Sequence, residues 1–197
     1  MSNTLTKTTF FADLHQQIAL HCETVVNRFC PLPDADLQWQ PTVKDKTEWS
    51  ILQCFDHLNL THAYYTAKFG PLLSDAPRVT SAADRYKASF WGGIYMYFSL
   101  NTKYSFPSPE PITPKAQPDR QVLNQYLAHQ EALLQHLEEA AVVDLVKTMI
   151  PIEKFVRFNL GDCLKILVYH DELHIGQAQR VFAQLGNTTQ PETMDYR

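Results

Sequence analysis

Four proline-free segments with helical spacing of apolar residues constrain the fold of this chain more than any other feature. Each segment repeats apolar side chains near positions i, i+3, i+4 and i+7, which is the period of an amphipathic α-helix. We predict helices over residues 10–29, 48–69, 119–140 and 160–185. No strand-like alternation of comparable length competes with this pattern. Four helices that must each bury an apolar face predict an all-α four-helix bundle.

Residue types that begin or end helices flank these segments. The Gly70–Pro71 step is predicted to end the second helix, because proline lacks the N–H that would continue it. Asn159 is well placed to cap the fourth helix, and Asp162 follows three residues later in its first turn. The Gly186–Asn187 step is predicted to end that helix.

Residues 71–118 form a long crossover between the second and third helices, and they hold seven of the 12 prolines. A connection of about 50 residues is long for a compact domain and usually carries function or some structure of its own. The aromatic run over residues 86–104 is expected to pack on the bundle, with a pocket wall as the alternative. The motif PSPEPITP, residues 107–114, is typical of an extended, polyproline-like chain. We interpret residues 1–197 as one domain.

The charge pattern argues against large anionic partners. The formal net charge is −4 and the basic residues are scattered singly, whereas nucleic acids and anionic membranes select clustered Lys and Arg. The N-terminal residues lack an apolar signal region, and no stretch approaches the ~18 apolar residues of a membrane span. We therefore expect a cytoplasmic protein in which the four cysteines are free thiols: Cys22, Cys30, Cys54 and Cys163.

His170 and His174 interrupt the apolar stripe of the fourth predicted helix. Their i, i+4 spacing projects both imidazoles from one face, where their nitrogens can reach one ion. Burying two imidazoles is unfavourable unless each finds a partner. Spacing alone leaves two interpretations open, a divalent-metal site and a pair of hydrogen-bonded core histidines.

The surrounding sequence differs from the zinc-protease motif HExxH. Asp171 takes the place of the glutamate that follows the first histidine, and Glu172 comes one residue later. Aspartate has a shorter reach for a general base, and Glu172 lies on another helix face. We therefore set the metalloprotease interpretation aside.

A metal held by two histidines needs a further ligand from elsewhere in the bundle. His57 and His62, both in the second predicted helix, are equally good candidates from spacing alone. The remaining candidates lie on the first and third helices: His15, His21, His129 and His136.

Two segments, Glu48–Leu58 at the start of the second predicted helix and Leu160–Val181 in the fourth, carry a resemblance to a known family. They resemble the DinB-like family of four-helix-bundle proteins, which is related to YfiT-type metal-dependent hydrolases. The segment EWSILQCFDHL, Glu48–Leu58, is similar to the family's Trp-Ser helix start followed by His-Leu. The segment Leu160–Val181 is similar to the family's last helix, with two histidines four apart followed by Ile-Gly-Gln. Leu173 departs from the pattern, because many members carry a histidine directly before the last one.

The resemblance implies a three-histidine metal site made of His57, His170 and His174. It implies nickel or zinc as the ion, with water in the remaining coordination positions. It also implies an up-down-down-up bundle, with the long crossover between the second and third helices, and a homodimer.

The resemblance further implies a metal-dependent hydrolase or a thiol S-transferase, with a thiol or an electrophile as small-molecule substrate. The catalytic residues stay unassigned, because no side chain stands out as a general base. The polar groups expected to orient ligands or substrate are Asp56, Tyr64, Asp171 and Gln177. The alternative is a protein without turnover, in which a metal staples the bundle or the pocket holds a small molecule in a stress response.

Overall fold

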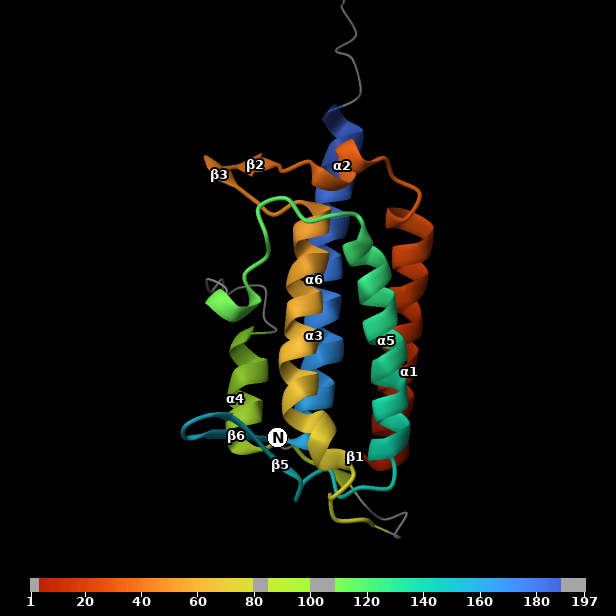
Figure 1. Ribbon diagram of the computed structural model, residues 1–197, viewed down its shortest axis with the longest axis vertical. Coiled ribbons are helices and arrows are strands. Elements are labelled where there is room, and N and C mark those ends of the chain that lie inside the picture. Colours follow the sequence, from red (N-terminus) through yellow and green to blue (C-terminus); the bar gives the residue numbers. More distant parts are fainter. Residues whose placement is uncertain (1–3, 80–84, 100–108, 189–197) are drawn as a thin grey trace, which may run out of the picture.

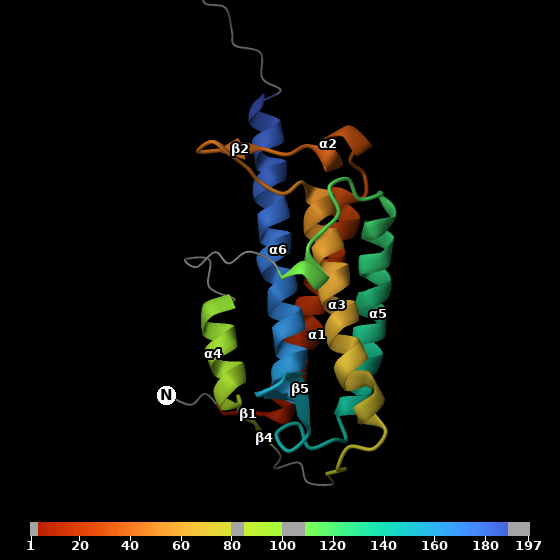
Figure 2. The same cartoon turned by 60° about the vertical axis from the view of Figure 1, so that its left-hand side comes forward.

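The computed structural model describes residues 4–79, 85–99 and 109–188, and over these ranges the chain is mostly helical. Four long helices lie side by side (Figures 1 and 2): α1 (Lys7–Thr24), α3 (Ile51–Leu73), α5 (Gln121–Ala140) and α6 (Leu160–Thr188). The chain colours in Figure 1 show α1 and α6 running one way and α3 and α5 running the other. This helical content agrees with the all-α prediction.

Short elements occupy the connections. A π-helical turn, η1 (Val25–Phe29), extends α1 and is followed by α2 (Asp34–Gln38), β2 (Thr42–Val43) and β3 (Lys46–Thr47). The crossover holds β4 (Arg85–Tyr86), α4 (Phe90–Ser99) and the 3₁₀ turn η2 (Glu110–Ile112). Among the described residues, three antiparallel strand pairs form: β1 (Leu5–Thr6) with β4, β2 with β3, and β5 (Met149–Glu153) with β6 (Val156–Asn159).

Capping side chains set the starts of two helices. Ser50 caps α3 in a capping box with Gln53, so this helix begins at Ile51 rather than at residue 48. Asn159 caps α6 as predicted, because its Oδ1 accepts from the Asp162 N–H at 2.8 Å. The Asp162 carboxylate accepts in return from the Asn159 N–H at 3.1 Å.

Two predicted helix ends were wrong. α3 runs through Gly70 and Pro71 to Leu73. Phe69 and Leu73 are both buried, so packing on either side of the proline outweighs the one missing N–H near the helix end. α6 likewise continues through Gly186 to Thr188.

Three connecting segments carry structure of their own, and one of them corrects a prediction. The connection between α5 and α6 contains the β5–β6 hairpin, whose Pro151 sits beside a register shift that tolerates it. Within the PSPEPITP motif, Glu110–Ile112 form a 3₁₀ turn rather than extended chain, while residues 107–108 lie outside the described residues. α4 forms within the aromatic run, of which residues 100–104 also lie outside the described residues.

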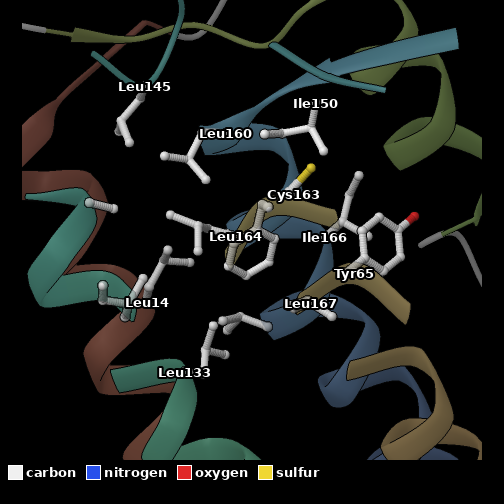
Figure 3. Packing of buried hydrophobic residues seen from close by; sticks show 14 of the residues in the cluster. Leu14, Tyr65, Leu133, Leu145, Ile150, Leu160, Cys163, Leu164, Ile166 and Leu167 are labelled. Carbon is white, nitrogen blue, oxygen red and sulfur yellow. The ribbon is translucent and has the colours of Figure 1, made fainter. Parts of the chain in front are cut away.

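Two apolar clusters are stacked along the bundle. Figure 3 shows part of one, in which α6 side chains such as Leu164 and Leu167 meet Leu14, Tyr65 and Leu133 from the other three helices. The second cluster lies toward the α2 end and includes Phe29, Phe55, Tyr126, Ile175 and Val181. Cys54 and Cys163 are buried in these clusters and are free thiols.

A polar layer separates the two clusters at the same level of all four helices. It contains His21 of α1, His62 of α3, Gln130 of α5 and Asp171 of α6, all of them buried. His62, Gln130 and Asp171 hydrogen-bond to one another across α3, α5 and α6, so the layer constrains the relative register of these three helices.

A buried carboxylate ties the crossover to the bundle. Asp162 accepts hydrogen bonds from the Tyr86 hydroxyl at 2.9 Å and from the Ser89 N–H at 3.1 Å. The first turn of α4 lies so close that a Cβ on Gly92 would overlap the Asp162 carboxylate. Within the described ranges, none of the helices combines the length and the apolar character needed to cross a membrane.

Candidate metal centre

His57, His170 and His174 come together in the interior of the bundle. Each offers one ring nitrogen to a group in which all three atoms lie within 4.8 Å of one another. α3 supplies His57, and α6 supplies the other two from successive turns. His57 and His170 are 2% and 7% exposed, and His174 is half-buried. A group of this composition can hold a metal ion.

The closest nitrogen pair has the spacing that a shared ion requires. His57 Nε2 and His170 Nε2 are 3.4 Å apart. A tetrahedral ion about 2.1 Å from each nitrogen would separate two ligand nitrogens by about 3.4 Å. Two lone pairs that face each other at this distance repel, so a proton or a cation between them is favourable.

Hydrogen bonds on the far side of two rings leave Nε2 free to bind an ion. His57 Nδ1 donates to the Ile112 carbonyl oxygen at 2.6 Å, and His174 Nδ1 donates to Gln177 Oε1 at 3.0 Å. Because a backbone carbonyl oxygen can only accept, the Ile112 contact sets the Nδ1–H tautomer of His57 and leaves its Nε2 lone pair facing the cluster. The Gln177 contact favours the same tautomer of His174. His170 Nδ1 is buried and has no hydrogen-bond partner among the described residues.

Burial keeps the three imidazoles neutral near pH 7. Desolvation lowers the pKa of His57 and takes the pKa of His170 well below its ordinary value, helped by the neighbouring histidines. Burial and the proximity of His57 lower the pKa of His174 to about 4. Since metals bind the neutral ring, no proton needs to leave before an ion enters at neutral pH.

Trp49 packs against two of the three rings. Its ring centroid lies 5.0 Å from that of His57 and 5.7 Å from that of His174. Trp49 directly precedes the Ser50 cap of α3 and is half-buried, so its indole forms one side of the cluster.

The other histidines proposed as third ligands lie elsewhere. His62 binds Asp171, and the ring of His129 stacks on His62 with centroids 5.6 Å apart. His136 pairs with Glu139 at 3.1 Å, and His15 is exposed on α1. His21 is buried in the polar layer, with no hydrogen-bond partner for either ring nitrogen among the described residues.

Of the four polar groups expected near the site, two lie there. Gln177 contacts His174, and Asp56 accepts from the Lys115 N–H in the crossover segment that also contacts His57. Tyr64 instead donates to the Ile152 carbonyl oxygen of β5, and Asp171 is enclosed in the polar layer. In the described part of the chain no carboxylate or thiol joins the three-histidine group.

Sequence reasoning missed two contributors to this cluster. Trp49 could have been noticed, since it stands within the motif that carries the family resemblance. The Ile112 carbonyl has no signal in the sequence, because any residue supplies the same backbone oxygen and the contact spans 55 positions.

The fold and the cluster define a helical bundle with a buried, neutral, three-histidine group. A sequence model of the DinB superfamily matches residues 17–178, which is most of the chain and includes all three histidines. The chain belongs to the DinB superfamily. Comparison with curated proteins and with solved structures finds no match.

Proposed function

We propose that this protein binds one divalent metal ion through His57, His170 and His174 and uses it as a metal-dependent hydrolase or thiol S-transferase. One observation carries the metal site: three neutral imidazoles converge, and the two Nδ1–H bonds to Ile112 and Gln177 leave Nε2 free on their rings. Three imidazole ligands suit zinc and nickel alike, and both stay candidates.

The number of ligands favours chemistry at the metal. Three protein ligands leave a coordination position for water or substrate, whereas structural zinc sites normally have four protein ligands. A bound ion of this kind supplies Lewis acidity, which lowers the pKa of a coordinated water or thiol. The chain's own part is to hold the rings, to keep them neutral and to surround them with the Trp49 indole and the Ile112 backbone.

Metal analysis of protein purified without a His-tag tests the site. We expect about one equivalent of zinc or nickel after reconstitution, and we expect His170→Ala to lose it. Less than about a tenth of an equivalent in the reconstituted wild-type protein would contradict the proposal. Unchanged metal content in His170→Ala would contradict the ligand assignment.

The reaction is tested with the metal-loaded protein. A panel of low-molecular-weight thiols with electrophilic acceptors distinguishes transfer from hydrolysis of esters and amides. Turnover that follows the metal content and is lost in His174→Ala supports the enzyme.

The burial of His57 and His170 favours a second candidate function, in which the metal ion links α3 to α6 and the protein catalyses no reaction. This candidate predicts a metal-dependent gain in unfolding temperature together with no metal-dependent product across the panel.

We also propose a single-domain, cytoplasmic homodimer built as the family's up-down-down-up bundle. In the described part of the crossover, α4 exposes five large apolar side chains: Phe90, Trp91, Ile94, Tyr97 and Phe98. These side chains are 37–73% exposed, so this face would supply part of the roughly 800 Å² per partner of a standard interface. Light scattering of wild type and Tyr97→Ser tests the dimer, and a monomeric wild type would contradict it.

A further inference from the structure

A short segment of the crossover, residues 112–116, lies against the start of α3, and we call it the strap. In Figures 1 and 2 the green chain runs from η2 along the upper half of the bundle to the start of α5. Lys115 and Ala116 are exposed and Ile112 is only half-buried. Burial of the strap's own side chains therefore contributes little to holding it in place.

Three α3 side chains hold the strap by hydrogen bonds. Gln53 Nε2 donates to the carbonyl oxygens of Lys115 at 3.2 Å and Ala116 at 3.3 Å. The Asp56 carboxylate accepts from the Lys115 N–H at 2.8 Å, and His57 Nδ1 donates to the Ile112 oxygen at 2.6 Å. Positions 53, 56 and 57 share one helix face, so one turn of α3 binds the strap at both of its ends.

The Gln53 and Asp56 side chains are themselves fixed. Gln53 Oε1 accepts from the Ser50 N–H at 3.0 Å and from Gln40 Nε2 at 2.7 Å, which leaves its Nε2 hydrogens directed at the strap. Asp56 is 5% exposed, so its carboxylate depends on protein donors rather than on water. Neither residue belongs to the three-histidine group.

We propose that Gln53 and Asp56 are positioning residues of the metal centre, which act on His57 through the strap. By holding residues 115 and 116 they place the Ile112 carbonyl where it accepts the His57 Nδ1 proton. That bond sets the ring's tautomer and orientation, and so directs the Nε2 lone pair into the cluster. This role rests on the proposed metal site. It adds the two residues that orient His57, the third ligand, before an ion binds.

The test compares zinc affinity and His57 tautomer in four variants of the full-length, tag-free chain. Asp56→Ala removes the acceptor for Lys115, whereas Asp56→Asn keeps an acceptor oxygen. Gln53→Glu keeps the capping-box acceptor but removes both donors to the strap. Asn59→Ala is the matched control, because it removes a buried hydrogen bond from the same helix to α5, where Asn59 Nδ2 donates to the Val122 oxygen at 2.9 Å.

We expect Asp56→Ala and Gln53→Glu to bind Zn²⁺ about 10- to 100-fold more weakly than wild type in competition with a chromogenic chelator. Asp56→Asn should restore affinity to near the wild-type value, and Asn59→Ala should lower the unfolding temperature without changing zinc affinity. Wild-type affinity in both Asp56→Ala and Gln53→Glu would overturn the proposal.

Nitrogen-15 NMR of the metal-free protein separates this inference from the metal site itself. We expect His57 of the wild type in the Nδ1–H tautomer, and a mixture of tautomers in Asp56→Ala. A wild-type protein that binds no zinc would contradict the proposed function. In that case the His57 tautomer of the metal-free variants would still show whether the strap orients this ring. An Nε2–H tautomer of His57 in the wild type would overturn that role.

Discussion

His62 Nε2 lies 2.9 Å from each carboxylate oxygen of Asp171, and both side chains are 1% exposed. The same carboxylate accepts from the Tyr126 hydroxyl at 3.2 Å and from Gln130 Nε2 at 2.8 Å. This network binds His62, which helical spacing could not distinguish from His57 as the third metal ligand. It lies in the polar layer between the two apolar clusters. Asp171 therefore acts in the interior of the bundle, although it directly follows His170 in the sequence.

The first prediction concerns the stability of this layer. Asp171→Ala should destabilise the protein by about 3–5 kcal/mol, because it leaves His62, Tyr126 and Gln130 buried without their acceptor. Asp171→Asn, which keeps one acceptor oxygen, should cost less. Urea unfolding of metal-free protein measures both values.

Asp13→Ala, which removes the half-buried acceptor of the Tyr169 hydroxyl, is the control and should cost about 1 kcal/mol. If all three variants lost the same free energy of unfolding, the polar layer would stabilise the protein no more than an ordinary half-buried hydrogen bond does.

The second prediction separates the two histidines of α3. His57→Ala should lower zinc affinity by at least about 100-fold, since two imidazoles remain. His62→Gln should keep about one equivalent of zinc while it loses stability. Isothermal titration under conditions where both variants are folded measures the difference. The reverse order of effects would show that the family-based choice of His57 is wrong.

The third prediction concerns pH and the metal-free protein. The pKa of His174 is lowered to about 4 by burial, against 6.5 in the unfolded chain. Between these values the unfolded state binds more protons, so stability is complete above pH 6.5 and falls as the pH drops toward 4. One such histidine changes the unfolding free energy by up to about 1.4 kcal/mol per pH unit.

Urea unfolding with a chelator at pH 5 and pH 7 checks this dependence. His174→Asn should show a smaller difference between the two pH values than wild type. An identical pH dependence would mean that His174 titrates normally in the folded protein.

The fourth prediction uses two neighbouring glycines of α4. Gly92→Ala should destabilise the protein by about 1–3 kcal/mol, because the new Cβ overlaps the Asp162 carboxylate that anchors the crossover. Gly93→Ala is the matched control. Its Cβ would meet the Ala88 Cβ at an ordinary 4.0 Å, and it should be neutral or stabilising by up to about 1 kcal/mol. Thermal unfolding of both variants measures the difference, and equal effects would argue against the close packing of α4 on Asp162.

Local patterns in the amino-acid sequence predict the helices and two members of the cluster. The spacing of apolar residues, the positions of prolines and the residue type of Asn159 are local signals. They were therefore enough to locate the four long helices and the cap of α6. The i, i+4 spacing on one helix was enough to put His170 and His174 on the same face. Helix ends were less predictable, since α3 continues past Pro71 when Phe69 and Leu73 are buried by other helices.

Which histidine of α3 joins that pair cannot be derived from helical spacing, because it depends on contacts between distant parts of the chain. His57 and His62 are equivalent in spacing, and their roles depend on what other helices and the crossover place beside each. Asp171 binds His62, whereas the Ile112 carbonyl of the strap accepts on the far side of His57, whose Nε2 lies 3.4 Å from that of His170. A backbone carbonyl such as that of Ile112 has no signature in a sequence, because its position depends on the path of the whole chain. Spacing alone therefore indicates only the pair His170 and His174 as metal ligands. The family resemblance adds His57, and the fold brings the three imidazoles together.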